Sequence, residues 1–597
     1  MRLATFLLEN TESWGFVIAD PVSGEERIVE PTRVPAVLER TILSTSGYAH
    51  SRPEFRDDWP ADLAGALASG DDGLSELARL ARFLERYLAQ SDAAVLDLVS
   101  HRVADVELLA PIPRPRLCWG LVTNAPSFVR NKVGIDHLNL FPLGHQRPQG
   151  SVIGSGAPVI MRGGHHVPLM SYNVELGVVI GRGGRYIALE DAMDHVAGFT
   201  TVTDVAGTYY YGVVPGNEGR GYHLPPEYDD WLYQATASWG GKIADSLCPV
   251  GPYLVTKDEV GDPYDLLVYT RQNGRQRDRA HTSAMMLGIE RVIHWYSSFA
   301  TLHPGDVIHF GTMGVDGLPI PSEQLERNPT VLESEIEDVG LLRNPVRVIE
   351  PHEPVPFESH PSYAVRRAAQ EPPLTASEWS VEQARHVYTA FGNHEQAAGE
   401  GLPRLAVPRF LNGPASSLGA SGTPVELPVR ATELEVAIEL AVVIRRLTSG
   451  TARGGAKDAM LSLSPLVSLC DLSFADTVIE PARAGERHIP AVYGRWADGF
   501  NVLPSVVGGE VGEWRERRMA LTVGDEEVSA STSDYLFGPE DLIEAISAQS
   551  TLFPGDVVTL GSTTARVVRV TAETPVRVAA AIDGLGTIAF DIVPASH

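Results

Sequence analysis

The chain repeats itself, and this internal duplication limits its fold more than any other feature of its 597 residues. YNVELGVVIG at 172–181 returns as VAIELAVVIR at 436–445, which aligns Glu175 with Glu439. WGGKIADSLCP at 239 returns as VYGRWADGFNV at 492, and TLHPGDVIHFG at 301 returns as TLFPGDVVTLG at 551. A fourth pair, TVTDVAG at 201 and SLCDLSF at 468, aligns Asp204 with Asp471. Four blocks in the same order predict two copies of one unit of about 240 residues.

The duplication divides the chain into four parts. Within each unit, short β-branched runs between Gly and Pro turns dominate, and a few helices each precede a PGDV turn, so we expect a mainly β, α+β fold. A Pro-rich polar stretch between the units is typical of a linker. The predicted parts are a small N-terminal α+β domain at 1–113, the first repeat at 114–345, the linker at 346–375 and the second repeat at 376–597.

Charge and cysteine content exclude several classes of protein. The net charge of −28 opposes binding to nucleic acid or to anionic membranes. The opening MRLATFLLENTES is too short an apolar run for a signal peptide, and we find no window of about 20 residues that could span a bilayer. Cys118, Cys248 and Cys470 lie far apart and form no CxxC, which predicts neither a disulfide framework nor a cysteine zinc site. A cytoplasmic protein fits these features best.

An amide and a carboxylate interrupt the apolar strand at 172–181. Side chains alternate along a strand, so Asn173 and Glu175 share one face while Val174 and Leu176 share the other. A buried carboxylate is costly unless it is paired or bound to a cation, so Glu175 needs a partner. Only four lysines occur among 48 basic residues, at 132, 242, 257 and 457, which makes Lys242 within the repeated WGGKIAD block a candidate functional residue.

These blocks resemble a known family. VELGVVIG, GFTTVTDV, WGGKIADSLCPVGPYLV, the NG of RQNGRQ and LHPGDVIHFGT occur in the order typical of the fumarylacetoacetate hydrolase family. MRLATF and LLAPIPRPRLCWGL resemble that family's N-terminal region and its junction with the catalytic domain. A tandem pair is similar to the two-repeat decarboxylase/isomerase members of homoprotocatechuate breakdown. The resemblance implies two tandem mixed β-rolls.

The resemblance also implies a metal site. Family members bind Mg²⁺ or Mn²⁺ on two Glu of an ExE strand and one Asp, and the ion chelates a 1,3-dicarbonyl or 2-oxo acid. The second Glu corresponds to Glu175, the Asp to Asp204 and an active-site Lys to Lys242, but Asn173 replaces the first Glu. Oxygen ligands on one strand face suit a hard cation, and exchanging a carboxylate for an amide weakens such a site without forbidding it. A solvated Lys242, and carboxylates satisfied by backbone N–H groups or Arg, are the structural alternatives.

Further site candidates flank these residues. Pro126 stands where the family's hydrolytic His would be, so His137 or His145 would have to replace that base from a loop, unless they are simply exposed. Tyr209, Tyr210 and Tyr211 begin a Tyr-rich segment suited either to a lid over an aromatic or polyene substrate or to packing. Thr312, after the PGDV turn, is a further substrate-binding candidate.

The second repeat departs further from the pattern. Ala437 occupies the first Glu position and Arg495 replaces the Lys, leaving Glu439 and Asp471 as vestigial ligands and His394 near the expected dyad. We therefore predict a structural repeat, with a Glu439–Arg495 ion pair where a metal would sit. Family members are usually dimers, so the two repeats are expected to pair within one chain, with a homodimer as the alternative.

Three functions remain open. The first is an enzyme of this family that acts on a small dicarbonyl or 2-oxo acid through its enol or enolate by C–C hydrolysis, decarboxylation or isomerisation, in specialised metabolism as one option. The second is a metal-independent acid–base catalyst of cyclisation, dehydration or tautomerisation built on Asn173, Glu175, Asp204 and Lys242. The third is a non-catalytic binding protein.

Overall fold

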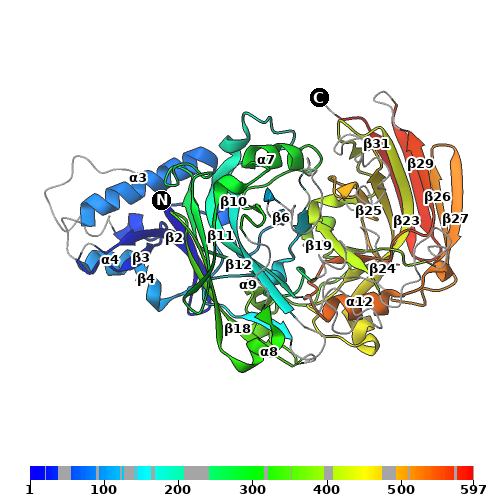
Figure 1. The fold of residues 1–597 in the computed structure, drawn as a ribbon. Coiled ribbons are helices and arrows are strands. Elements are labelled where there is room, and N and C mark those ends of the chain that lie inside the picture. Colours follow the sequence, from blue (N-terminus) through cyan, green and yellow to red (C-terminus); the bar gives the residue numbers. More distant parts are fainter. Residues whose placement is uncertain are drawn as a thin grey trace.

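The protein is described here by a computed structural model. It describes residues 1–20, 22–37, 55–88, 93–121, 124–126, 142, 144–162, 169–207, 241–314, 320–350, 353–394, 408–473, 493–508, 511–569 and 574–595. Strands dominate both repeats, which confirms the mainly β, α+β expectation. The N-terminal region and first repeat form one half of the molecule and the second repeat forms the other (Figure 1).

Each repeat contains one large and one smaller sheet. The large sheet of the first repeat runs in the order β4 (Ser100–Arg102), β3 (Glu26–Val29), β2 (Thr11–Ala19), β1 (Arg2–Leu8), β12 (Cys248–Thr256), β11 (Val196–Gly207), β10 (Leu169–Ile180), β15 (Val307–His309), β6 (Cys118–Leu121) and β7 (Gly144–Gln146). Three short strands join it: β5 (Glu107–Leu108), β8 (Val152–Ile153) and β16 (Ile320–Pro321). The smaller sheet runs β14 (Arg275–His281), β13 (Leu267–Gln272), β17 (Thr330–Ile336), β18 (Gly340–Ile349) and β9 (Val159–Arg162).

The second repeat reproduces this plan. Its large sheet runs β20 (Phe410–Pro414), β19 (His386–Ala390), β28 (Val557–Thr559), β23 (Glu433–Ile444), β24 (Met460–Asp471), β25 (Asn501–Leu503) and β21 (Leu418–Ala420), with β29 (Ala565–Arg569) beside β23. Its smaller sheet runs β22 (Val425–Glu426), β31 (Gly586–Val593), β30 (Val576–Ile582), β26 (Arg518–Val523) and β27 (Glu526–Ser531). The corresponding helices are α7 (Ile289–Ser297) and α12 (Pro539–Ser547). The other α-helices in the described part of the chain are α2 (Leu63–Leu67), α3 (Gly70–Leu88), α4 (Ala93–Val99), α8 (Ser322–Arg327) and α9 (Tyr363–Ala368).

Strand register corrects one part of the repeat alignment. Asn173 lies opposite Asp204 between β10 and β11, whereas Ala437 lies opposite Ser468 between β23 and β24. The strand pairs have the same bulge, at Ile180 and at Ile444, so the register is equivalent throughout. Ser468 is therefore the counterpart of Asp204, and the predicted alignment with Asp471 was wrong by three residues.

The N-terminal region extends the sheet of the first repeat. Arg2 and Leu3 of β1 pair with Val255 and Leu254 of β12, so β1 to β4 continue the large sheet at its edge. Helix α3 packs on this extension, because Leu77 shares one apolar core with Val202. The expected separate domain at 1–113 thus shares both a sheet and a core with the repeat that follows it.

The stretch expected to be a linker has ordered elements. Strand β18 crosses its expected start at 346, and α9 lies within it. Val365 of α9 packs against Phe553 of the second repeat, while Arg366 forms an ion pair with Glu107 next to β1. Pro-rich composition predicts turns, but it does not exclude a short helix that has a core to pack against.

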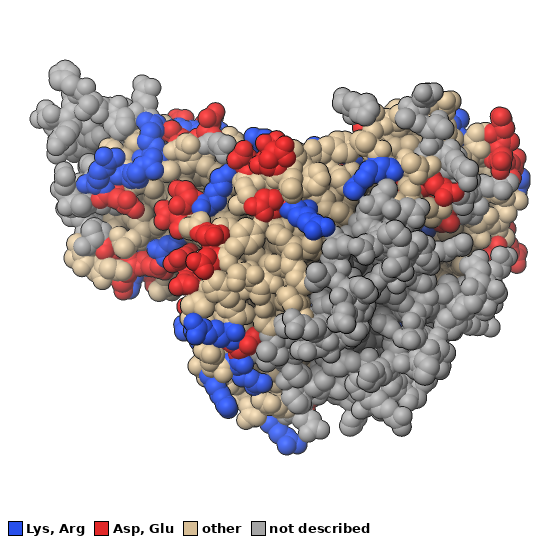
Figure 2. All heavy atoms as spheres, turned by 45° about the horizontal axis from the view of Figure 1, so that its top comes forward, with Lys and Arg blue, Asp and Glu red and all other residues tan. Residues whose placement is uncertain are grey.

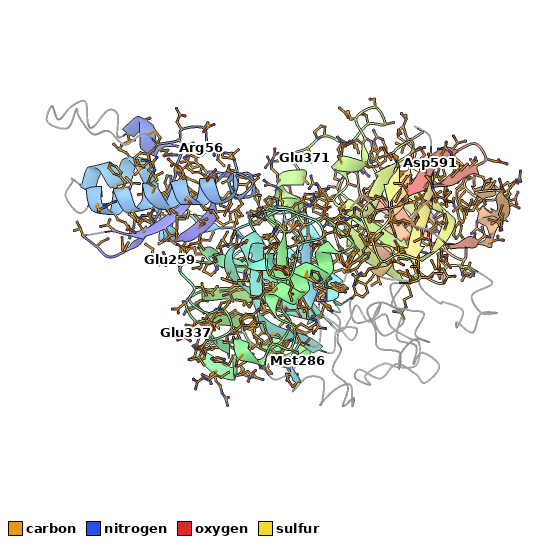
Figure 3. All side chains as sticks on the ribbon, turned by 90° about the horizontal axis from the view of Figure 1, so that it is seen from above. Arg56, Glu259, Met286, Glu337, Glu371 and Asp591 are labelled. Atoms are coloured by element: carbon orange, nitrogen blue, oxygen red, sulfur yellow. The ribbon has the colours of Figure 1, made fainter. Side chains whose placement is uncertain are left out.

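The two repeats contact each other through a reciprocal pair of aspartates. Asp245 of the first repeat accepts hydrogen bonds from the backbone N–H of Thr551 at 3.0 Å and from its hydroxyl at 2.5 Å. Asp498 of the second repeat accepts the same two bonds from Thr301, at 2.9 and 2.5 Å. Each contact is the counterpart of the other, so the repeats pair as the two subunits of a twofold dimer would. The parts lie side by side when viewed from above, with Glu337 on one half and Asp591 on the other (Figure 3).

Charges on the described surface are mixed. Lys and Arg lie between groups of Asp and Glu on the face in Figure 2, where the described residues form no continuous basic patch.

Replacing the interface aspartates should destabilise the protein unequally. Asp245 also lies 3.3 Å from His360 Nε2, whereas Oδ1 of Asp498 has no partner among the described residues. We expect Asp245→Ala to lower the free energy of unfolding by about 1–3 kcal/mol and Asp498→Ala by less, measured by urea denaturation. Equal effects would contradict the asymmetry, and no effect from either variant would contradict the interface.

The effect of Asp245 should also depend on pH. Burial alone would raise its pKa, but hydrogen bonds from His360 and Thr551 hold the pKa of Asp245 below its usual value. A lowered folded pKa gives stability that is present above the unfolded pKa of about 3.9 and is lost as pH falls through the folded value. The stability difference between wild type and Asp245→Ala should therefore be full at pH 7 and should narrow below about pH 4. A gap that widens on acidification would refute this.

Candidate functional site

Asp204 is the centre of a buried charge cluster in the first repeat. It lies near the end of β11 with 4% of its side chain exposed. Lys242 Nζ donates to its Oδ2 and Arg147 donates to its Oδ1. Burial would raise the pKa of this carboxyl, but the charges of Lys242 and Arg147 hold it well below its usual value. Asp204 is therefore an anion held between two cations.

The partner that Glu175 requires is His309. Nδ1 of His309 hydrogen-bonds to Glu175 Oε2, which also accepts the backbone N–H of Gly311 at 3.0 Å. Burial, and then the neighbouring Asp204 charge, raise the pKa of Glu175, while Glu175 raises the pKa of His309 against the effect of its own burial. The pair thus holds a proton between two fully buried groups.

A glycine makes room for His309. Gly120 of β6 lies opposite His309 of β15, and a Cβ at position 120 would come within 2.2 Å of His309 Nε2. Only glycine therefore permits the ring to lie here. His145 of β7 lies opposite Gly120 from the other side, so the two histidines flank the same glycine in one row across three strands.

We had expected His145 to lie in a loop. It is instead part of the core. Its side chain is 1% exposed, and its Nε2 lies 3.7 Å from Asp204 Oδ1. Burial, followed by the charges of Lys242 and Arg147, holds the pKa of His145 well below its usual value, so the imidazole is neutral. Strand β7 places it there because residues 144–146 pair with β6.

Two cysteines join the cluster from the other side. All three cysteines are buried free thiols. Cys118 and Cys248, however, come together with His309, with ligand atoms of all three within 4.8 Å of one another. The hydrogen bond with Cys118 lowers the pKa of Cys248 to about 7. Sequence separation was thus a wrong guide to this pair, because β6 and β12 face the same interior.

The oxygen ligands expected for Mg²⁺ or Mn²⁺ fit poorly here. Asn173 and Glu175 do lie on the face of β10 that holds Asp204, as predicted from strand alternation. Both oxygens of Asp204, however, are bound by side-chain cations, and His309 and Gly311 bind one oxygen of Glu175. A hard cation would have to displace these groups, so no step of the chemistry below is assigned to such an ion.

The other first-repeat candidates are placed as follows. Thr312 is buried just beyond β15, three residues after His309. Lys242 is the most accessible of the cations around Asp204, with 12% of its side chain exposed against 0% for Arg147. His137, Tyr209, Tyr210 and Tyr211 lie outside the described residues, and their roles stay predictions.

The second repeat has the predicted ion pair in place of a site. Arg495 donates to Glu439 Oε1 at 2.6 Å, and Ser468 donates to the same oxygen at 2.6 Å. Thr559, the counterpart of His309, donates to Glu439 Oε2. The cavity beside Arg495 measures about 10 Å³, roughly enough for a single water molecule. His394 lies near Tyr535 through a β-bridge, and Asp471 corresponds to Gly207, so neither completes a ligand set with Glu439.

Sequence reasoning missed Arg147 and His309. The signal was present for both: GHQRP at 144–148 carries His145 and Arg147 together, and HFG at 309–311 differs from TLG at 559–561 within a repeated block. A position that differs between otherwise matching repeats is where one copy has gained or lost a specific contact.

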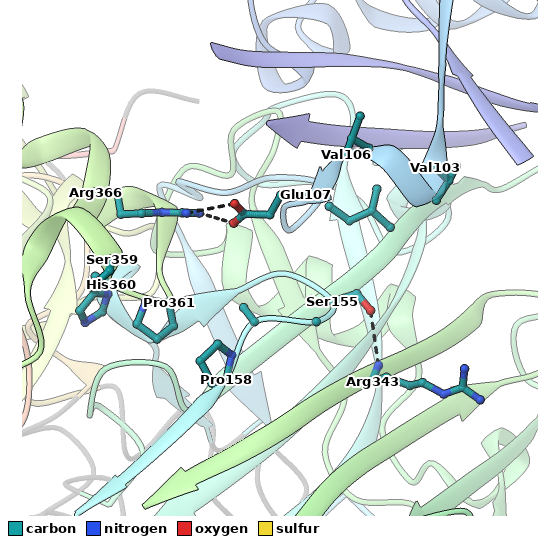
Figure 4. Close-up of a pocket in the computed structure, with 13 residues that line it drawn as sticks. Val103, Val106, Glu107, Ser155, Pro158, Arg343, Ser359, His360, Pro361 and Arg366 are labelled. Atoms are coloured by element: carbon teal, nitrogen blue, oxygen red, sulfur yellow. Dashed lines mark hydrogen bonds and ion pairs between the residues drawn. The ribbon is translucent and has the colours of Figure 1, made fainter. Parts of the chain in front are cut away.

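A cavity among the described residues lies away from this cluster. It has a volume of about 490 Å³ between the N-terminal strands and the stretch before α9, where Glu107 and Arg366 form an ion pair and Ser155 bonds the backbone of Arg343 (Figure 4). None of its lining residues belongs to the Asp204 cluster, so it is not the candidate site. No helix among the described residues combines the length and apolarity needed to cross a bilayer.

Comparison with known proteins agrees with this fold. The model of the fumarylacetoacetate (FAA) hydrolase C-terminal domain matches twice, at residues 119–347 and 383–593. Oxaloacetate tautomerase FAHD2A of Bos taurus is 39% identical over 178 residues, which cover 30% of this chain and 50% of the relative. Maleylpyruvate hydrolase of Aquipseudomonas alcaligenes is 29% identical over 281 residues, 45% of this chain and 86% of the relative.

A solved structure shows a similar partial match. Maleylpyruvate hydrolase from Sphingobium sp. SYK-6, in complex with manganese(II) ion and pyruvate, is 22% identical, with a TM-score of 0.38 and coverage of 58% of this chain and 99% of that one. The chain thus spans only about half the length of the first curated relatives, while the domain model covers most of both repeats. The chain belongs to the fumarylacetoacetate hydrolase family and carries the family's domain twice.

Proposed function

We propose that the first repeat is an enzyme site that binds a small oxo acid and stabilises its enol or enolate form. The observation that carries this proposal is the convergence of Lys242 and Arg147 on Asp204. Fixed cations in a buried site stabilise negative charge that develops on a substrate oxygen. The matched relatives are named for oxaloacetate and maleylpyruvate, which are both oxo acids.

Lys242 is the residue that we expect to contact the substrate. Arg147 is fully buried, whereas Lys242 retains some exposure and bonds to Asp204 through Nζ only. An incoming carboxylate or enolate oxygen can therefore share Nζ with Asp204, while Arg147 keeps Asp204 charged and in place. Asn173, opposite Asp204 in the strand pair, would present its amide to the same oxygen.

Tautomerisation, isomerisation or decarboxylation fits the site better than C–C hydrolysis. All of these reactions pass through an enol or enolate, but hydrolysis also needs a base that activates water. Pro126 occupies the position where the family resemblance places that base. Hydrolysis remains the runner-up because a maleylpyruvate hydrolase matches over most of its own length.

The metal-independent acid–base catalyst is a second candidate. It is favoured by the pairing of both Asp204 oxygens with side-chain cations, which neutralises the site without an ion. Activity that survives exhaustive chelation would support it, and activity that returns only with added metal would exclude it.

Replacing Lys242 should abolish catalysis while the fold remains. We expect Lys242→Met to lower kcat/KM for ketonisation of an enol oxo acid by about 10²–10³, followed by loss of enol absorbance with oxaloacetate and acylpyruvates. Lys257→Met is the matched control, because the ammonium of Lys257 bonds to the backbone carbonyl of Met193, at 3.1 Å, and lies outside the Asp204 cluster. Binding of oxalate, an enolate mimic, should weaken in Lys242→Met alone. Wild-type turnover by Lys242→Met would refute the assignment.

Breaking the ion pair of the second repeat should change stability and leave activity intact. Arg495→Met strands the charge of Glu439, whose side chain is fully buried, and should cost about 3–5 kcal/mol of unfolding free energy. Adding Glu439→Gln should recover much of that loss. Thermal melting and turnover, measured on the same samples, check both points. A folded Arg495→Met protein without activity would instead give the second repeat a catalytic role.

A further inference from the structure

We infer that His145, His309 and Asp204 form a binding site for a divalent transition-metal ion such as Zn²⁺. The site would lie beside the oxygen set predicted for Mg²⁺ and would share only Asp204 with it. One ring nitrogen from each histidine and one Asp204 oxygen lie within 4.8 Å of one another.

Unpartnered nitrogens are the first reason. Neither ring nitrogen of His145 has a hydrogen-bond partner among the described residues, and neither does Nε2 of His309. The side chains are 1% and 0% exposed, so water outside the protein does not satisfy them. A buried polar group without a partner costs about 1–3 kcal/mol. An ion bound between the two rings would satisfy one nitrogen of each.

The orientation of His309 is the second reason. Its Nδ1 is bonded to Glu175, which leaves Nε2 directed away from Glu175. Metal-bound histidines in proteins are commonly held in this way, with one nitrogen on the metal and the other hydrogen-bonded to a carboxylate. Glu175 would thus be a positioning residue for the ion, not a ligand.

Differences between the repeats are the third reason. The row that reads His145, Gly120 and His309 across three strands reads Leu411, Thr389 and Thr559 in the second repeat. Both histidines are replaced together, and the glycine that admits the ring of His309 is replaced with them. Three positions that change as a group indicate one shared function of the group.

The ligand types select the ion. Two imidazoles and one carboxylate suit Zn²⁺ or Fe²⁺, whereas Mg²⁺ prefers oxygen ligands alone. Zinc lies about 2.0–2.2 Å from such ligand atoms. The three atoms, which lie within 4.8 Å of one another, would therefore have to close in on the ion, and Lys242 or Arg147 would have to give up one Asp204 oxygen to it. Three protein ligands leave a position open for water or for a substrate oxygen.

The positive charges beside Asp204 predict how one substitution should change metal binding. Lys242 and Arg147 both bind Asp204, and each would repel an added dication. Removing the charge of Lys242 should therefore tighten metal binding, by about tenfold. Such tightening is expected only if the ion binds close to Asp204. Metal binding is measured here without substrate, so this inference stands or falls separately from the proposed function.

Zinc binding to the full chain after chelator treatment tests the site. Calorimetry should show one Zn²⁺ per chain that millimolar Mg²⁺ does not displace, with Lys242→Met binding more tightly than wild type. His145→Leu and His309→Thr should each weaken binding by about tenfold or more. Each variant introduces the residue that the second repeat has at the same position. Because Thr559 bonds to Glu439 there, the fold should persist in both variants. Thermal melting checks that it does. Thr559→Val is the matched control and should bind as wild type does.

Cobalt(II) spectra decide between this site and its neighbour. Co²⁺ bound by nitrogen and oxygen ligands should give only weak visible absorption bands. An intense thiolate charge-transfer band, lost in Cys118→Ser or Cys248→Ser, would move the ion to the two cysteines and overturn the assignment. The absence of stoichiometric Zn²⁺ binding, or binding unchanged in both histidine variants, would also overturn it.

Discussion

A carboxylate in the interior of a β-roll needs a counter-charge, and both repeats are arranged around this requirement. The conserved plan of the strands puts Glu175 and Glu439 at the same point of the large sheet, where each is buried. In the second repeat Arg495, Ser468 and Thr559 satisfy the glutamate completely and fill the space around it. In the first repeat His309 pairs with Glu175. A second buried acid, Asp204, pairs with Arg147 and Lys242. One repeat has a single ion pair around its glutamate, and the other has a larger cluster of charged groups.

Much of this was readable from the sequence, for definite physical reasons. The duplication and the mainly β fold follow from repeated blocks and turn spacing. The shared face of Asn173 and Glu175 follows from strand alternation, and the nearness of Asp204 follows from the family resemblance. The Glu439–Arg495 pair follows from the cost of an unpaired buried charge. These features depend on local geometry or on a requirement that any fold must meet.

The rest depended on which distant strands become neighbours. Cys118 and Cys248 carry no local signal that relates them to Asp204, and only the folding of β6 and β12 around one interior brings them together. His145 looked like a loop residue because its stretch is rich in Gly and Pro, although tertiary pairing makes it a strand. The three-residue error at Asp471 arose because an Asp was aligned with an Asp, whereas hydrogen-bond register aligns backbones regardless of side chain.

The reciprocal contacts of Asp245 and Asp498 give one chain the arrangement that a twofold dimer has between two subunits. In a homodimer every substitution appears twice, so a change that improves one active centre must be tolerated at the symmetry-related position as well. Covalent fusion removes that constraint. The first repeat could acquire a histidine that only a neighbouring glycine admits, while the second kept bulkier residues and served as a stable packing partner. Asymmetry of this kind lets half of a molecule change its chemistry while the other half preserves the assembly.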